Sequence, residues 1–251
     1  MSFASARARA YGETIVFFST TNHHGVSLEQ AMTSEAILQT ADALGDVDLD
    51  DHERAEIAAV LEPLRRHHQP TFEHCIRVGR LAERIGEASS FDPHKLLIAG
   101  LVHDCGKAHT PLSVLDCTGE WTKRFETIIR RHVVSGYYML RAHGMNEAAA
   151  IMVWHHKFQA NPYPSVMPDN PPGLDEFQLA MAPLLGRMIA IADTFDALHR
   201  RNSKFDHQLS EAEIRGHMLR LHKGEEYLIH KLYDNGAFHC WHCVDGDACS
   251  A

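Results

Sequence analysis

The chain has 251 residues and a mass of 28.2 kDa, which suits one large domain or one domain with a small appendage. It is 45% hydrophobic and 23% charged with a net charge of −9, so we expect a folded protein that binds neither duplex nucleic acid nor a membrane. No apolar run reaches the roughly 18 residues of a membrane span. Six cysteines make no dense disulfide framework, which predicts a cytoplasmic protein. Twenty histidines are the outlier, and histidine is the commonest metal ligand.

Hydrophobic periodicity predicts an all-α fold. Residues 1–65 form an N-terminal segment to which we assign a regulatory or dimerisation role, and a homodimer stays open. This segment has a candidate strand over 14–19 and helical patterns over 28–44 and 52–66. From about residue 71 the pattern is strongly helical, and His74, Val78, Leu81 and Ile85 form one amphipathic stripe.

The remaining elements follow from apolar periodicity and end signals. An N-cap with proline at Asp92-Pro93 and a capping box at Ser210-x-x-Glu213 mark two helix starts. Residues 160–173 are rich in proline and asparagine, which predicts a loop. The helices are expected over 94–105, 121–143 (ended by Gly144), 146–157, 174–200, from 210 onward, and 225–233.

The central histidine group is His103-Asp104-Cys105-Gly106-Lys107. Adjacent His and Asp side chains near a helix end project about 100° apart, so both can reach one cation. Asp104 can also bridge two metals, Gly106 permits the helix to stop, and Lys107 can hold a phosphate as a point charge. A capped helix end without a metal is the alternative interpretation of this pair.

Other candidate ligands lie within apolar helical stretches, where a polar residue is least expected. For a single histidine there, a buried and hydrogen-bonded core residue is the favoured alternative. Asp193 follows Met188-Ile189-Ala190-Ile191-Ala192, and a buried carboxylate is costly unless it is paired or bound to a metal. These candidates are His74, His132, His155, His156 and Asp193.

In this order the motifs resemble the HD superfamily of metal-dependent phosphohydrolases, and in particular its HD-GYP branch, which degrades cyclic dinucleotides. His103 to Lys107 resembles the HD-x-G-K motif, Trp154-His155-His156 the HH element, and Tyr163-Pro164 the end of the GYP signature. Asp193 to Leu198 resembles the closing D-x-x-D-A-L. The resemblance implies a helical HD bundle over residues 66–235 with a binuclear metal site in its core.

The resemblance also implies a role for each matching residue. His74, His103, Asp104 and Asp193 would serve one metal, and His132, His155 and His156 the other, with Asp104 as the bridge. Asp104 and Lys107 would be catalytic, and Lys107, Tyr163 and Arg201 would bind substrate. Nitrogen and oxygen ligands suit two divalent ions, with iron or manganese expected and zinc or nickel as alternatives. A metal-bridged hydroxide would then attack phosphorus.

The sequence departs from the family pattern in the segment expected to recognise substrate. The acid of the family's HHE is replaced by Lys157, and Gln159 to Pro164 replaces DG-x-GYP without its glycines. Pro70 stands where some relatives carry a glutamate for a third metal, so we expect two metals. Asn202 occupies the position of a phosphate-binding arginine, directly after Arg200 and Arg201.

Residues 236–251 form a Cys/His-rich tail. Cys240, His242, Cys243 and Cys249 are a candidate second metal site of the zinc type, although we favour an unstructured, oxidation-prone tail. For the whole chain we expect a phosphodiesterase for cyclic dinucleotides, such as cyclic di-GMP, or related phosphoesters. An HD-fold di-iron oxygenase and a non-catalytic nucleotide-binding relative are the alternatives.

Overall fold

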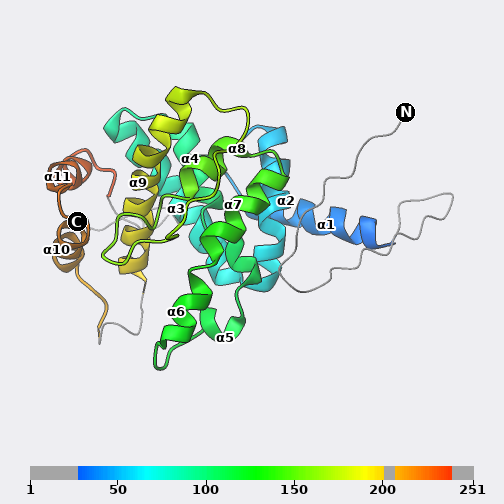
Figure 1. Cartoon of the computed structure of the whole chain (residues 1–251), viewed down its shortest axis with the longest axis horizontal. Helices are drawn as coiled ribbons and strands as arrows, with labels where there is room; N and C mark the ends of the chain where they lie inside the picture. The colour runs from blue at the N-terminus through cyan, green and yellow to red at the C-terminus, as the bar shows by residue number, and fades with distance from the viewer. Residues whose placement is uncertain (1–27, 201–206, 239–251) are drawn as a thin grey trace. The chain divides into compact units, whose positions relative to one another are not determined.

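The computed structural model describes residues 28–200 and 207–238, which contain helices and loops but no strand (Figure 1). The all-α prediction is confirmed for this part of the chain, while the candidate strand at 14–19 lies outside it. Among the described helices, none is both long and apolar enough to cross a membrane. The elements are α1 (Leu28–Ala43), α2 (Asp51–His67), α3 (Gln69–Ser89), α4 (Pro93–Val102), a 3₁₀ turn η1 (Cys105–His109), α5 (Leu112–Leu115), α6 (Lys123–Ile129), α7 (His132–Ala142), α8 (Asn146–Met152), α9 (Glu176–His199), α10 (Glu211–Leu221) and α11 (Glu226–Asp234).

Most helices begin at a residue whose side chain binds the free backbone N–H groups of the first turn. The Asp92 carboxylate accepts two such hydrogen bonds at α4, and Ser210 and Glu213 form a reciprocal capping box at α10, as predicted. Asp50 at α2 and Asp175 at α9 form two further capping boxes. These two capping boxes were not predicted from the sequence, although both fit the same pattern.

The helix predicted over 121–143 is two helices, α6 and α7, separated at Arg130 and Arg131. The His132 ring donates a hydrogen bond to the carbonyl of Ile129, which a continuous helix would pair with the N–H of residue 133. In the same way α8 ends at Met152 rather than near Lys157, because the His155 ring binds the Met152 carbonyl. Side-chain hydrogen bonds to the backbone therefore end both helices earlier than their apolar periodicity indicates.

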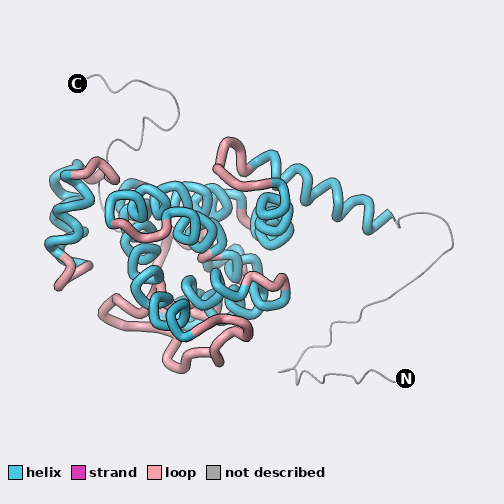
Figure 2. Tube along the Cα trace, turned by 90° about the horizontal axis from the view of Figure 1, so that it is seen from above, coloured by secondary structure: helices cyan, strands magenta, loops and turns pink. Residues whose placement is uncertain are grey.

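Figures 1 and 2 show the described helices from two directions. The long helix α3 contacts α2, α4, α9 and α11, and its apolar stripe contributes to both hydrophobic cores. One core lies among α3, α4, α8, α9, α10 and α11, and the other among α2, α3, α4, η1, α7 and α8. Helices α3 and α4 meet at Gly79 and Gly100, where a Cβ on Gly100 would lie 2.8 Å from the Gly79 Cα. This close approach sets His103, at the end of α4, beside His74 of α3.

The compact unit that holds these cores begins at residue 36, earlier than the boundary predicted at 65/66. The reason is α2, whose Ile57, Val60, Leu61 and Leu64 are fully buried in the second core. Helix α2 is therefore part of the bundle rather than of a separate N-terminal segment. A regulatory or dimerisation role for residues 1–65 stays a prediction.

Candidate metal centre

Three of the predicted ligands lie just beyond a helix end and donate a hydrogen bond from Nδ1 to the carbonyl three residues earlier. The last carbonyls of a helix lack partners within it, so these rings satisfy groups that need a donor. Because a carbonyl only accepts, Nδ1 carries the proton, and Nε2 of the neutral ring is left with a lone pair. The pairs are His103 with Gly100 (2.7 Å), His132 with Ile129 (2.5 Å) and His155 with Met152.

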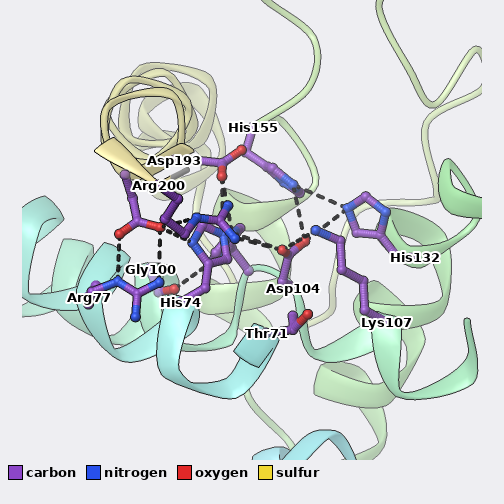
Figure 3. Close-up of polar contacts among 12 residues, drawn as sticks. Thr71, His74, Arg77, Gly100, Asp104, Lys107, His132, His155, Asp193 and Arg200 are labelled. Carbon is purple, nitrogen blue, oxygen red and sulfur yellow. Dashed lines mark hydrogen bonds and ion pairs between the residues drawn. The ribbon is translucent and has the colours of Figure 1, made fainter. Parts of the chain in front are cut away.

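His74, on α3, is oriented by a carboxylate instead. Its Nδ1 lies 2.6 Å from Oδ2 of Asp196, which is fully buried on α9. Arg77 and Arg200 hold that carboxylate, with Nε–O distances of 2.7 Å and 3.0 Å (Figure 3). Burial opposes ionisation of Asp196, but the hydrogen bonds from His74 and Arg77 lower its pKa to about 2. An ionised Asp196 therefore fixes the His74 ring so that Nε2 points to the centre of the bundle.

Asp104 lies between two groups of ligand atoms (Figure 3). Its Oδ2 is 3.5 Å from Nε2 of His74 and 3.4 Å from Nε2 of His103. On this side Oδ1 of Asp193 lies 3.2 Å from Nε2 of His74. The other oxygen of Asp104, Oδ1, is 3.1 Å from Nε2 of His132 and 4.0 Å from Nε2 of His155. We call His74, His103 and Asp193 the mixed cluster, and His132, His155 and His156 the histidine cluster.

The histidine cluster contains no carboxylate of its own. Nε2 of His132 and Nε2 of His155 are 3.4 Å apart, and the ring of His156 lies 4.0 Å from that of His155. Burial lowers the pKa of His155 to about 3 and that of His156 well below its ordinary value, with neighbouring histidines adding to both shifts. Imidazole nitrogens this close are suited to share a cation.

Two buried polar atoms test whether a metal fits this site. Nε2 of His103 and Oδ1 of Asp104 have no hydrogen-bond partner among the described residues, although both side chains are fully or almost fully buried. Unpaired buried polar atoms are costly, and a cation between the clusters would satisfy both. The donor set of imidazole nitrogens and carboxylate oxygens suits a divalent transition metal. The clusters therefore fit metal ions.

Lys107 and Gly106 complete the surroundings of Asp104. The Lys107 ammonium pairs with Oδ2 of Asp104. Burial would raise the pKa of Asp104, but Lys107, His103 and His132 hold it well below its usual range. A Cβ on Gly106 would lie 2.0 Å from the His132 carbonyl, so glycine is needed here for close packing of η1 on α7. This contact, rather than the freedom to end a helix, explains Gly106.

Tyr163 is buried against the histidine cluster. Its ring stacks on His156 at 4.4 Å between centroids, and the Arg130 guanidinium lies 5.0 Å from the centroid of the Tyr163 ring. Lys157, which replaces the family's acid, donates to the Pro164 carbonyl at 2.9 Å. The structure thus shows Tyr163 supporting a candidate ligand, and its contact with substrate stays a prediction. Arg201, and Cys240, His242, Cys243 and Cys249 of the tail, lie outside the described residues.

A cavity of about 720 Å³ opens beside the two clusters. His155, His156 and Asp193 line it, together with residues of α9 and α10 and the segment after α8. This volume is in the range of pockets that hold nucleotide-sized ligands. The site therefore combines candidate metal ligands with room for a small molecule.

The residues that orient His74 were not predicted from the sequence. Asp196 is 122 positions from His74, and Arg77 lies one helical turn after His74 on α3. A signal was present, because Asp196 is the second aspartate of the D-x-x-D-A-L motif and Arg77 adds a cation to the edge of an apolar stripe. Only the packing of α3 on α9 shows that these two charges meet.

The chain was compared with known proteins, and the model of the HD domain matches residues 71–198, just over half of the chain. This chain belongs to the HD domain family. The resemblance seen in the sequence is thereby confirmed. The crystal structure of the HD domain of the L. monocytogenes phosphodiesterase PgpH has the same fold, with a TM-score of 0.52 and 16% identity over 71% of this chain and 95% of that one.

Curated relatives include two bacterial phosphodiesterases. The 3'3'-cGAMP-specific phosphodiesterase 1 of Vibrio cholerae is 31% identical over 137 residues, which are 52% of this chain and 29% of the relative. The cyclic di-GMP phosphodiesterase of Thermotoga maritima is 29% identical over 167 residues, which are 62% of this chain and 42% of the relative. The similarity thus covers less than half of the length of either relative.

Proposed function

We propose that this HD domain protein is a metal-dependent phosphodiesterase that hydrolyses a cyclic dinucleotide or a related phosphodiester. The observation that carries this proposal is the position of Asp104, whose two oxygens face different ligand clusters. The names of the relatives and the adjoining cavity of about 720 Å³ support the substrate class. Two divalent ions, iron or manganese, with zinc or nickel as alternatives, are the cofactors that the donor set suits.

Each residue of the site has a task in this reaction. The mixed and histidine clusters would each hold one ion, and Asp104 would join them. Two ions held in this way supply Lewis acidity and lower the pKa of a water molecule. Asp193, His155 and His156 line the cavity, so the ions would lie where a substrate in the cavity could reach them. Lys107 stays protonated, because Asp104 and Asp193 raise its pKa against the effect of burial, and its ammonium can stabilise charge on the phosphoryl oxygens.

Metal analysis combined with a phosphodiesterase screen tests this function. Protein purified without chelator is loaded with manganese or ferrous iron and offered several cyclic and linear dinucleotides, because the segment 159–164 departs from the family pattern. We expect about two ions per chain and cleavage of at least one dinucleotide, lost on treatment with chelator and restored by metal.

Two other outcomes would contradict the proposal. Metal-loaded protein that cleaves none of these esters but consumes dioxygen with an organic substrate would be an oxygenase. Protein that binds a dinucleotide and does neither would be a non-catalytic relative.

A further inference from the structure

The cavity beside the metal centre has a second wall that the proposed reaction does not use. Helix α10 packs against α9, which carries Asp193, and its C-terminal end brings Arg220 and His222 to the cavity. The same cavity is lined by His155, His156 and Asp193. A ligand that reaches the metal centre through this cavity therefore passes the cation of Arg220, on α10, and the imidazole of His222, which directly follows that helix.

His222 is an unusual residue for a protein interior. Its side chain is 4% exposed, and neither ring nitrogen has a hydrogen-bond partner among the described residues. Burial, with a contribution from Arg187, lowers the pKa of His222 to about 4, so the ring is neutral at pH 7. A neutral imidazole offers one donor and one acceptor. Burying this donor and acceptor without hydrogen bonds is costly, and a ligand in the cavity would supply the missing partners.

Arg220 brings a positive charge to the same wall. The described residues provide no carboxylate partner for it, whereas Arg200, also on the cavity, is paired with Asp196. Its guanidinium lies back along α10, with one terminal nitrogen 3.3 Å from the point where Gly216 would carry a Cβ. Glycine at this position leaves room for the guanidinium. The Arg220 side chain is exposed, and a planar guanidinium without a carboxylate partner matches the oxygens of a phosphate group.

We propose that Arg220 and His222 form a subsite for the part of the substrate that is not cleaved, with Arg220 contacting a second phosphate group. This inference rests on the proposed function and adds a substrate requirement to it. A dinucleotide carries two phosphates, so the second phosphate remains in the cavity when the first is at the metals. A phosphodiester with one phosphate makes no use of this subsite.

The test compares a dinucleotide with a substrate that has a single phosphate. Arg220→Gln is assayed with the dinucleotide that the wild type cleaves best and with bis(p-nitrophenyl) phosphate. Loss of a charged hydrogen bond should lower kcat/KM for the dinucleotide by about 10-fold to 100-fold, mainly through KM, and leave the single-phosphate ester within about twofold. Lys223→Gln is the matched control, because Lys223 is an exposed cation three residues further on that does not line the cavity.

A second variant and a binding measurement keep the proposal testable. His222→Leu, with its fold checked by thermal melting, should also lose more activity on the dinucleotide than on bis(p-nitrophenyl) phosphate. If the wild type cleaves no substrate, the proposed function fails. The subsite is then tested by equilibrium binding of 3'3'-cGAMP and cyclic di-GMP to wild type and Arg220→Gln.

Equal losses on both substrates, or an equal effect of Lys223→Gln, would overturn the subsite. In the binding assay, equal affinities of the two proteins, or no binding to either, would do the same.

Discussion

The two clusters on either side of Asp104 are built on different principles. In the mixed cluster a buried carboxylate, Asp196, orients His74, and Asp193 adds a second negative charge. In the histidine cluster helix-end carbonyls orient His132 and His155, and Asp104 supplies the one carboxylate within ion-pair distance of these two rings among the described residues. The mixed cluster thus has carboxylates of its own beside its imidazoles, whereas the histidine cluster shares the carboxylate of the bridge.

This difference gives histidines in the two clusters opposite pKa shifts. Burial would lower the pKa of His74, but hydrogen bonds to Asp104, Asp193 and Asp196 raise it to about 10, whereas burial lowers the pKa of His155 to about 3. A ring tied to a carboxylate is also the more basic metal ligand. We therefore expect the mixed cluster to hold its cation more tightly, and chelator to empty the histidine cluster first.

Removal of the shared bridge should have the largest effect. Asp104→Ala is expected to deplete both metals and abolish activity, because its two oxygens serve both clusters. The loss of metal affinity should exceed the about 10-fold to 100-fold that follows loss of a supporting partner. Metal content of the purified variants measures this, with Asp104→Asn as a control that keeps the shape of the side chain. Equal metal content in wild type and Asp104→Ala would show that Asp104 is no bridge.

A Lys107 variant tests whether metal binding and catalysis can be separated. Lys107→Ala should keep its metals, because an ammonium is no ligand, but should lower turnover about 10²-fold or more, as expected for loss of one donor to the transition state. Metal content and kcat are measured on the same preparation. A variant with normal kcat would exclude Lys107 from the reaction, and loss of metal would assign it to support of Asp104.

Variants that affect one cluster alone test the comparison directly. His132→Ala should lower the metal content mainly at one position, because His132 faces only Oδ1 of Asp104 among the bridge atoms. Asp196→Asn should weaken the other position by about 10-fold to 100-fold through His74. Chelator titration followed by metal analysis separates the two. If either variant loses both ions in parallel, the clusters are not independent.

His222 extends the comparison to a buried histidine with neither a carboxylate nor a carbonyl hydrogen-bond partner in the described part of the chain. The unfolded chain binds this proton near pH 6.5 and the folded protein only near pH 4. Between these values the unfolded state holds more protons, so His222 lowers the free energy of unfolding as the pH falls, by as much as about 3 kcal/mol.

Denaturant unfolding of metal-free wild type and His222→Gln from pH 7 to pH 4 measures this effect. The variant should lose less stability over that interval, and Lys223→Gln should match the wild type. Parallel curves for wild type and His222→Gln would mean that the ring gains a partner on acidification.

Much of the fold was predictable because its signals are local. The stripe of His74, Val78, Leu81 and Ile85 is buried as expected, and Asp92 and Ser210 begin helices as expected. The breaks after Ile129 and Met152 were not predictable from periodicity, because in each a histidine ring competes with the backbone for a carbonyl.

The sequence by itself determined which residue types are available for the metal centre and their order along the chain, because each motif is a short local pattern. The tertiary structure alone decided how they meet. It brings Asp196 to His74 across 122 positions and sets η1 on α7 at Gly106. It also turns the two oxygens of Asp104 toward different clusters. These relations depend on helix packing, in which residues far apart in the sequence become neighbours only once the apolar faces of the helices are buried together.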